Sequence, residues 1–277
     1  MAEFVGAYAA SHAPNLGRYW NDFPAPLRER LTAAYLAVGA RIKAARPDVL
    51  IVVSPDHWVN FFINNLPAIC VGVGEESDGP PEPFMQAFQR VIPGAPGLGQ
   101  HLLEHALAHD FEPSSSHRLI LDHGFCLPLE KMQFAALPPI LPIIINSLEP
   151  PMMSLNRCAE WGRMIVDAIR TYPGSERVAI LATGGLSHSI GEATMGVIEA
   201  DMDARIIALL HAGEVSPLVD YLEERLKTAG NGGHELRNWV VAQAAAGGKG
   251  FELIDYFPVE PVYVGCAWAA WNVGQEK

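Results

Sequence analysis

Four histidines occupy similar places in the sequence, because each follows an apolar stretch or lies in a turn beside Pro or Gly. They are His12 in SHAP, His57 in SPDHW, His123 in LDHGF and His188 in GGLSHS. Neutral imidazole binds Fe, Zn and other transition metals, and it also transfers protons near neutral pH. One histidine at the end of a strand is more often an ordinary hydrogen-bonding residue. Four histidines at one edge of a sheet instead predict a metal site or an acid–base site.

A metal site built from histidines also needs an anionic ligand, and Glu235 is the candidate. It follows a GNGG loop at 230–233 and opens an otherwise apolar helix. A carboxylate in that place could equally cap the helix, because the helix dipole favours negative charge at its N-terminus. Asp56, which precedes His57, would either orient the imidazole or simply end the strand.

Two other patterns point to different chemistry. His101, His105 and His109 are spaced four residues apart on one expected helix, and residues 101–105 fit the zinc-protease pattern HxxEH. The helix also has an ordinary apolar face, which favours a solvated histidine face over a metal site. Residues 185–189 (GLSHS) approach the nucleophile motif GxSxG but end in Ser, which argues against a serine hydrolase. Nucleotide binding has no support, because no GxGxxG follows a strand and no Walker loop occurs.

The elements that must position these residues alternate between strands and helices. We expect strands at 4–11, 49–53, 66–73, 138–146, 177–183 and 251–256, and helices at 25–45, 99–109, 154–172, 195–212, 215–228 and 234–246. Residues 74–96 are expected to form a long loop with one helical turn at 83–91, and 262–271 an apolar tail. Apolar runs such as VLIVV at 49–53 are typical of strands buried on both faces of a parallel sheet.

This order predicts an α/β fold, a three-layer α/β/α domain around a mostly parallel or mixed sheet. Ligands of such sheets bind at the carboxyl ends of the strands, so we expect the active site at that edge. We expect residues 1–277 to form a single domain, in which the helical last third caps the same edge.

Composition excludes several classes of function. The chain has 277 residues, 49% of them hydrophobic, and a formal net charge of −12. A negative surface without a Lys/Arg run argues against nucleic acid and acidic lipid as partners. The widely spaced cysteines predict reduced thiols (Cys70, Cys126, Cys158 and Cys266). Neither an export signal nor an apolar run of membrane-spanning length is present, so we expect a cytoplasmic protein without membrane contact.

Five segments together resemble a known family of enzymes. They are SHAPNLG at 11–17, SPDHWVNFF at 54–62, LDHGFCLPLE at 121–130, GGLSHS at 184–189 and HELRNWVVA at 234–242. In this order, and over nearly the whole chain, they resemble the class III (LigB-type) extradiol ring-cleaving dioxygenases. That family includes the catalytic subunit of protocatechuate 4,5-dioxygenase and the 2,3-dihydroxyphenylpropionate 1,2-dioxygenases.

The resemblance implies a metal site and a reaction. His12, His57 and Glu235 would be the ligands of a non-haem Fe(II), which leaves one face of the metal open for a catechol and O₂. The substrate would be a catechol or an aminophenol-type analogue, cleaved outside the diol with insertion of both oxygen atoms, as in the catabolism of aromatic compounds. The family also implies a homo-oligomer, in some members with a small second subunit.

The resemblance further assigns catalytic residues. His188 would take a proton from the diol and later return one, and His123 would donate a proton to the departing oxygen. Asp122 would hold the tautomer of His123.

Two alternatives remain open beside this interpretation. One is a zinc enzyme, or an enzyme of another divalent metal, on the same scaffold; the other is a non-enzymatic Memo-like binding protein. Aromatic residues near the motifs would form either an apolar substrate wall or plain core (Trp58, Phe61, Phe125 and Trp239).

Overall fold

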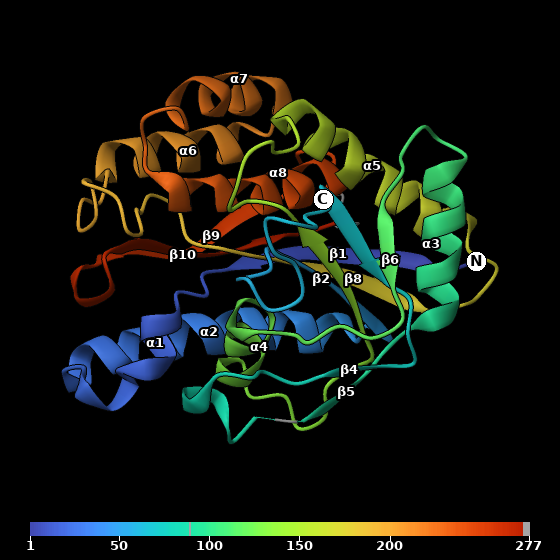
Figure 1. Cartoon of the computed structure of the whole chain (residues 1–277), viewed down its shortest axis with the longest axis horizontal. Helices are drawn as coiled ribbons and strands as arrows, with labels where there is room; N and C mark the ends of the chain where they lie inside the picture. The colour runs from blue at the N-terminus through green and yellow to red at the C-terminus, as the bar shows by residue number, and fades with distance from the viewer. Residues whose placement is uncertain (89, 274–277) are drawn as a thin grey trace.

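The computed structural model describes residues 1–88 and 90–273, in which eight strands form one large sheet (Figure 1). In spatial order they are β6 (Ser114–Ser116), β3 (Ile69–Gly72), β7 (Ile140–Ile145), β2 (Val49–Ser54), β8 (Arg177–Thr183), β1 (Glu3–Ala10), β10 (Val264–Trp271) and β9 (Phe251–Val259). The central strands β7, β2, β8 and β1 pair in parallel, and the pairs β3–β7, β1–β10 and β10–β9 are antiparallel. The prediction of a mostly parallel or mixed sheet is confirmed.

Helices cover both faces of this sheet. The α-helices are α1 (Pro14–Arg18), α2 (Ala25–Ala45), α3 (Pro96–Leu107), α4 (His123–Lys131), α5 (Leu155–Thr171), α6 (Ala200–Ala212), α7 (Val215–Arg225) and α8 (Leu236–Ala245). Figure 1 shows α2 and α4 on one face and α5 and α8 on the other, with α6 and α7 outside α8. Each face buries its own apolar core, as a three-layer α/β/α architecture requires.

Short 3₁₀ helices complete the connections, at Trp20–Asp22, Pro83–Met85, Asn231–Glu235 and Glu260–Val262. No helix in the described residues is both long and apolar enough to cross a membrane.

Three sequence predictions about the fold are wrong. The expected loop at 74–96 contains a two-stranded hairpin, β4 (Glu76–Asp78) paired with β5 (Val91–Pro93). The expected apolar tail is β10, which lies between β1 and β9 in the sheet. The last helices do not cap the carboxyl edge, because α6 and α7 pack over α8 and share the core on that face of the sheet.

The strand order explains why the candidate residues meet. Strand β8 lies between β1 and β2 and is parallel to both, so all three end at the same edge. His12 follows β1 by two residues and His57 follows β2 by three, while GGLSHS continues directly from β8. The sequence placed these residues at strand ends, and the topology makes those ends neighbours.

Candidate metal centre

Three side chains converge just beyond the ends of β1 and β2. His12 Nε2 lies 3.0 Å from Glu235 Oε1, and His57 Nε2 lies 3.6 Å from the same oxygen. The ligand atoms of the three residues all lie within 4.8 Å of one another, a spacing that a single metal ion can bridge. This set matches the ligands expected from the sequence.

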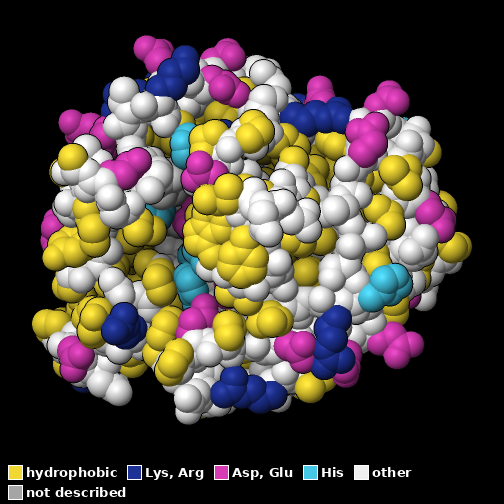
Figure 2. Space-filling view, viewed as in Figure 1, with side chains coloured by type: hydrophobic (Ala, Val, Ile, Leu, Met, Phe, Trp, Pro, Cys, Tyr) yellow, Lys and Arg dark blue, Asp and Glu magenta, His cyan; other side chains and the backbone are white. Residues whose placement is uncertain are grey.

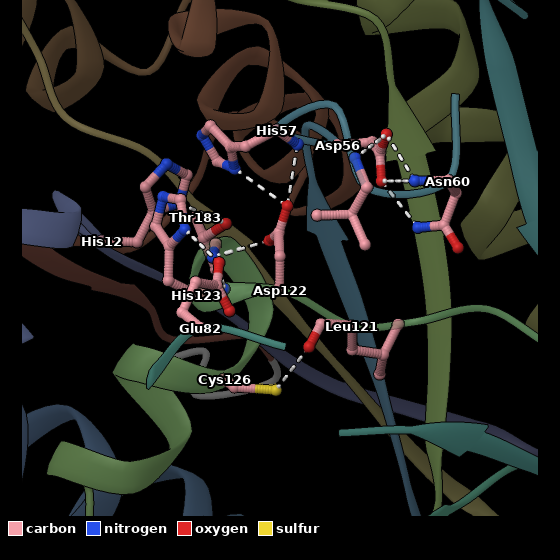
Figure 3. Close-up of polar contacts among 12 residues, drawn as sticks. His12, Asp56, His57, Asn60, Glu82, Leu121, Asp122, His123, Cys126 and Thr183 are labelled. Atoms are coloured by element: carbon pink, nitrogen blue, oxygen red, sulfur yellow. Dashed lines mark hydrogen bonds and ion pairs between the residues drawn. The ribbon is translucent and has the colours of Figure 1, made fainter. Parts of the chain in front are cut away.

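Hydrogen bonds on the far side of each ring turn the two imidazoles toward this point (Figure 3). His12 Nδ1 donates to Thr183 Oγ1 at 2.9 Å, and His57 Nδ1 donates to Asp122 Oδ2 at 3.1 Å. Both bonds place a proton on Nδ1, so Nε2 is the nitrogen of each ring that faces Glu235 and that a metal would bind. Partners of this kind commonly fix the tautomer and orientation of metal-binding histidines.

Glu235 is held by the turn after β8 and not by its own helix. Its Oε2 accepts a hydrogen bond of 2.7 Å from the backbone N–H of Gly185, and its side chain makes no capping bond to α8. Gly184 lies so close that a Cβ on it would come within 2.7 Å of Glu235 Cβ, and its φ of +136° also favours glycine. The orientation of Glu235 therefore does not match the capping alternative.

The electrostatics of the site fit a divalent cation. Burial lowers the pKa of His57, but Asp122 and Glu235 outweigh burial and raise it to about 10. Burial raises the pKa of Glu235, but the histidines around it hold that pKa well below its usual range. Two imidazoles and one carboxylate form the facial set typical of non-haem Fe(II), and Asp122 behind His57 adds a second negative charge.

His188 lies over the same point from the turn after β8. Its Nδ1 donates to the carbonyl of Leu186 at 3.0 Å, and its Nε2 lies 3.7 Å from Glu235 Oε2. The loop before α8 makes room for the ring, because a Cβ on Gly232 would meet His188 Nε2 at 2.2 Å. Nε2 is therefore free to exchange a proton with a molecule in the cavity.

His123 approaches from the start of α4. Its ring lies against that of His57, with centroids 4.1 Å apart. Glu82 Oε1 accepts hydrogen bonds from His123 Nδ1 at 2.7 Å and from its backbone N–H at 3.1 Å. The buried Nε2 has no hydrogen-bond partner among the described residues, and His123 lines the cavity. A buried, unpaired imidazole nitrogen at a cavity wall is suited to contact a ligand.

All five of these side chains line one cavity of about 140 Å³. Figure 2 shows histidine atoms within a cleft on this face of the molecule, beside a large apolar patch. The model of one protein family, the catalytic LigB subunit of aromatic ring-opening dioxygenase, matches residues 6–261. The chain belongs to the LigB family.

Curated relatives agree with this assignment. The chain is 26% identical to a 2,3-dihydroxyphenylpropionate/2,3-dihydroxicinnamic acid 1,2-dioxygenase of Burkholderia vietnamiensis, over 92% of each protein. It is 29% identical to the protein of that name in Xanthobacter autotrophicus, over 85% of this chain and 87% of the relative. An uncharacterized protein from Escherichia coli K12 has the same fold, with a TM-score of 0.68, 19% identity and coverage of 98% of this chain and all of the other. The LigB-family chain is thus a ring-cleaving dioxygenase, an enzyme that uses a metal and acts on a small aromatic molecule and O₂.

Two aspartates in this LigB-family site have partners other than those expected. Asp122 does not hold His123; it accepts hydrogen bonds from the ring and backbone of His57 and from the backbone of Gly124, where it caps α4. Asp56 does not orient His57; it accepts backbone hydrogen bonds at Val59, Asn60 and Phe61 and so folds the loop after β2.

Glu82 and Thr183 are the contacts that sequence reasoning missed. Glu82 lies in the Pro-rich segment 79–83, which carries no periodic signal. Thr183 is the last residue of β8, directly before Gly184 and Gly185, and this position is the one sequence signal that indicates a place near the site.

The competing patterns lie outside the cavity. His101 bonds to the carbonyl of Ala168 and to Thr171. Among the described residues, His101 and His105 of α3 and His109 beyond its end form no group of three ligand atoms close enough to share a metal. Ser187 Oγ donates to the buried Asp203 at 2.8 Å, which is a structural bond and not that of a nucleophile. None of the four aromatic residues considered for a substrate wall lines the cavity (Trp58, Phe61, Phe125 and Trp239).

Proposed function

We propose that this chain is an Fe(II)-dependent extradiol dioxygenase that opens a catechol-type ring in the catabolism of aromatic compounds, with residues 1–277 acting as one catalytic domain. One observation carries the proposal. The ligand atoms of His12, His57 and Glu235 converge at the floor of a ring-sized cavity, and the Nε2 atoms of His188 and His123 face the same space. A non-enzymatic binding protein would not need the imidazoles of His188 and His123 directed at that floor.

His12, His57 and Glu235 would hold the metal. Fe(II) bound there would supply the redox chemistry that a reaction with O₂ requires. Thr183 and Asp122 keep both ring nitrogens oriented, and Gly185 N–H keeps the carboxylate in place, so the site is assembled before substrate arrives.

His188 and His123 would move protons. The hydrogen bond from His188 Nδ1 to the Leu186 carbonyl leaves Nε2 as the base that takes a proton from a diol hydroxyl. The bond from His123 Nδ1 to Glu82 leaves Nε2 as the atom that donates a proton to an oxygen of the substrate or of O₂. In the overall reaction one ring C–C bond beside the diol and the O–O bond break, and both oxygen atoms enter the product.

The same donor set suits a second metal. Two histidines and a glutamate also bind zinc in hydrolytic enzymes. Zn(II) has no accessible redox change, so a zinc-dependent protein of this fold would not consume O₂.

Metal-free protein reconstituted anaerobically with Fe(II) or Zn(II) and then mixed with oxygenated catechols tests the proposal. We expect O₂ uptake and a yellow ring-opened product with Fe(II) alone. His57→Ala and Glu235→Gln should lose bound iron by elemental analysis, while His117→Ala, at an exposed histidine in the loop after β6, should retain it. Activity that follows Zn(II), or full iron occupancy in His57→Ala, would contradict the proposal.

Assembly is a further part of the proposal. The loop after β2, which also carries His57, exposes the large apolar side chains of Trp58, Phe62 and Ile63. Such exposed apolar loops commonly contact another chain, which supports a homo-oligomer or a complex with a small second subunit. Light scattering of the purified chain distinguishes an oligomer from a monomer.

A further inference from the structure

The lining of the cavity has two chemically different parts. Its floor carries the imidazoles and Glu235 described above. The rest of the lining, called here the apolar wall, is mostly apolar (Ala13, Pro14, Ile190, Met195, Val262 and Val264) and includes the uncharged polar side chains of Asn15, Ser189 and Tyr263. A catechol whose two oxygens face the floor would therefore place its ring carbons and any substituent against the apolar wall.

Among the described residues, no Lys or Arg lines the cavity. Arg237 lies two residues beyond Glu235 but is turned away, because its guanidinium donates to the carbonyl of Met153 at 2.9 Å and contacts His234. Arg18, one turn beyond Asn15 in α1, is exposed to solvent. Apart from the histidines of the floor, no described side chain of the lining therefore carries a positive charge that could pair with a carboxylate on the substrate, since Asn15, Ser189 and Tyr263 are neutral.

The polar groups near the apolar wall favour a neutral substituent. Ser189 lines the cavity, but its hydroxyl donates to Glu192 Oε2 at 2.9 Å. A substrate carboxylate at this wall would thus meet a second carboxylate just behind Ser189. Burying an anion without a partner is costly, and a neighbouring negative charge adds to that cost.

The size of the cavity limits the rest of the substrate. Its volume is about 140 Å³, and an engineered apolar cavity of about 150 Å³ holds benzene. One ring fills this space. Ile190 and Met195, each about half exposed at the mouth, leave a way out for a short chain on the ring.

We propose that the substrate of this site is an uncharged, single-ring catechol that carries hydrogen or a small apolar substituent, and that the cavity discriminates against a carboxylate. The proposal rests on the proposed function. It separates this chain from the relatives named above, whose names specify phenylpropionate and cinnamic acid compounds.

Steady-state kinetics of the Fe(II)-loaded enzyme test the preference. We compare catechol, 3-methylcatechol and 3-ethylcatechol with 2,3-dihydroxybenzoate and 2,3-dihydroxyphenylpropionate. We expect kcat/KM to be at least about tenfold higher for the neutral diols, and to rise several-fold with each added carbon up to the size limit. Equal or higher kcat/KM for the acids would overturn the proposal.

A variant that adds a positive charge to the cavity wall gives a sharper test. Ile190 is well placed for it, because Asn231 holds both its backbone N–H and its carbonyl, at 2.8 Å each. Ile190→Arg should raise the ratio of acid to neutral kcat/KM by about tenfold or more, since a guanidinium pairs with a carboxylate. Val197→Arg is the matched control, because Val197 is equally exposed in the same loop but does not line the cavity. An unchanged ratio in Ile190→Arg, or an equal rise in both variants, would overturn the proposal.

Calorimetry of the metal-free protein separates this proposal from the proposed function. Toluene and benzoate lack the diol, so their binding depends on the cavity wall and not on the metal. We expect toluene to bind more tightly than benzoate, and tighter benzoate binding would overturn the proposal. If no diol supports O₂ uptake but toluene is still preferred, the proposed function fails while the assignment of an apolar, uncharged ligand stands.

Discussion

Glu82 Oε1 accepts a hydrogen bond of 2.7 Å from His123 Nδ1, although 41 positions separate the two residues in the sequence. The bond fixes the ring so that its unpaired Nε2 faces the cavity. Burial, together with the charge of His57, lowers the pKa of His123, and Glu82 works against both effects. Glu82 is therefore a positioning residue that also supports the protonated form of His123.

We predict that Glu82→Gln lowers kcat by roughly 10- to 100-fold with little change in KM or bound metal. The alkaline limb of the kcat–pH profile should move to lower pH, because losing the carboxylate lowers the pKa of His123. Glu76→Gln is the matched control, since Glu76 pairs with Arg118 on the half-buried strand β4 and does not line the cavity. A parallel fall in metal content would show that Glu82 supports the metal site instead.

Asp122→Asn should weaken metal binding by roughly 10- to 100-fold, because the charge behind His57 is lost. The fold should persist, since Asn also serves as an N-cap for α4. Asp56→Asn removes the carboxylate next to His57 in sequence, whose hydrogen bonds go to residues 59–61 and not to the His57 ring, so it should change metal affinity little. Competition titrations with a chelator measure both affinities, and similar losses in the two variants would contradict the role of Asp122.

Metal affinity should rise with pH, because His57 is protonated in the metal-free protein. Because the pKa of His57 is raised to about 10, the ring must lose about one proton when the metal binds. The metal affinity should therefore increase roughly tenfold for each pH unit between about pH 6 and 9. The raised pKa of His57 also increases the free energy of unfolding of the metal-free protein. That contribution is complete below the ordinary His pKa of about 6.5 and is lost as pH rises through about 10. Calorimetry in buffers of different ionisation enthalpy counts the protons released, and no release at pH 7 would contradict the prediction.

Gly232→Ala should reduce turnover by about tenfold or more while bound metal is retained, because a Cβ there would displace the His188 ring. Gly233→Ala is the control, since the added Cβ would meet only the end of the Leu226 side chain, at 3.2 Å. If Gly232→Ala turns over at the wild-type rate, the loop before α8 does not set the position of His188.

Much of the fold could be predicted because buried strands leave clear apolar runs. Helix α2 and strand β8 have the predicted bounds, 25–45 and 177–183. The hairpin β4–β5 is not predictable because three-residue strands show no useful period. Strand β10 is not predictable because its residues (Val264–Trp271) are apolar or Gly and buried throughout, without alternation. The outer helices α6 and α7 were placed wrongly because their apolar faces do not specify which surface they cover.

The candidate site was partly predictable for a related reason. Chain position places His12, His57 and His188 at strand ends, and parallel pairing then brings these ends together. Hydrogen-bond partners depend on side-chain direction, which sequence adjacency does not give. Asp122 adjoins His123 in sequence but bonds to His57, while His123 bonds to Glu82 from a distant loop.

The placement of β8 between β1 and β2 has a consequence for how the enzyme is made. His12 and Glu235 are separated by 223 positions, and Thr183, which orients His12, belongs to a strand synthesised after both neighbours. A nascent chain that has not yet produced Glu235 lacks the carboxylate and cannot complete the proposed set of three ligands. Acquisition of the metal is therefore a late event in biosynthesis, after most of the polypeptide has left the ribosome and the central strands have paired.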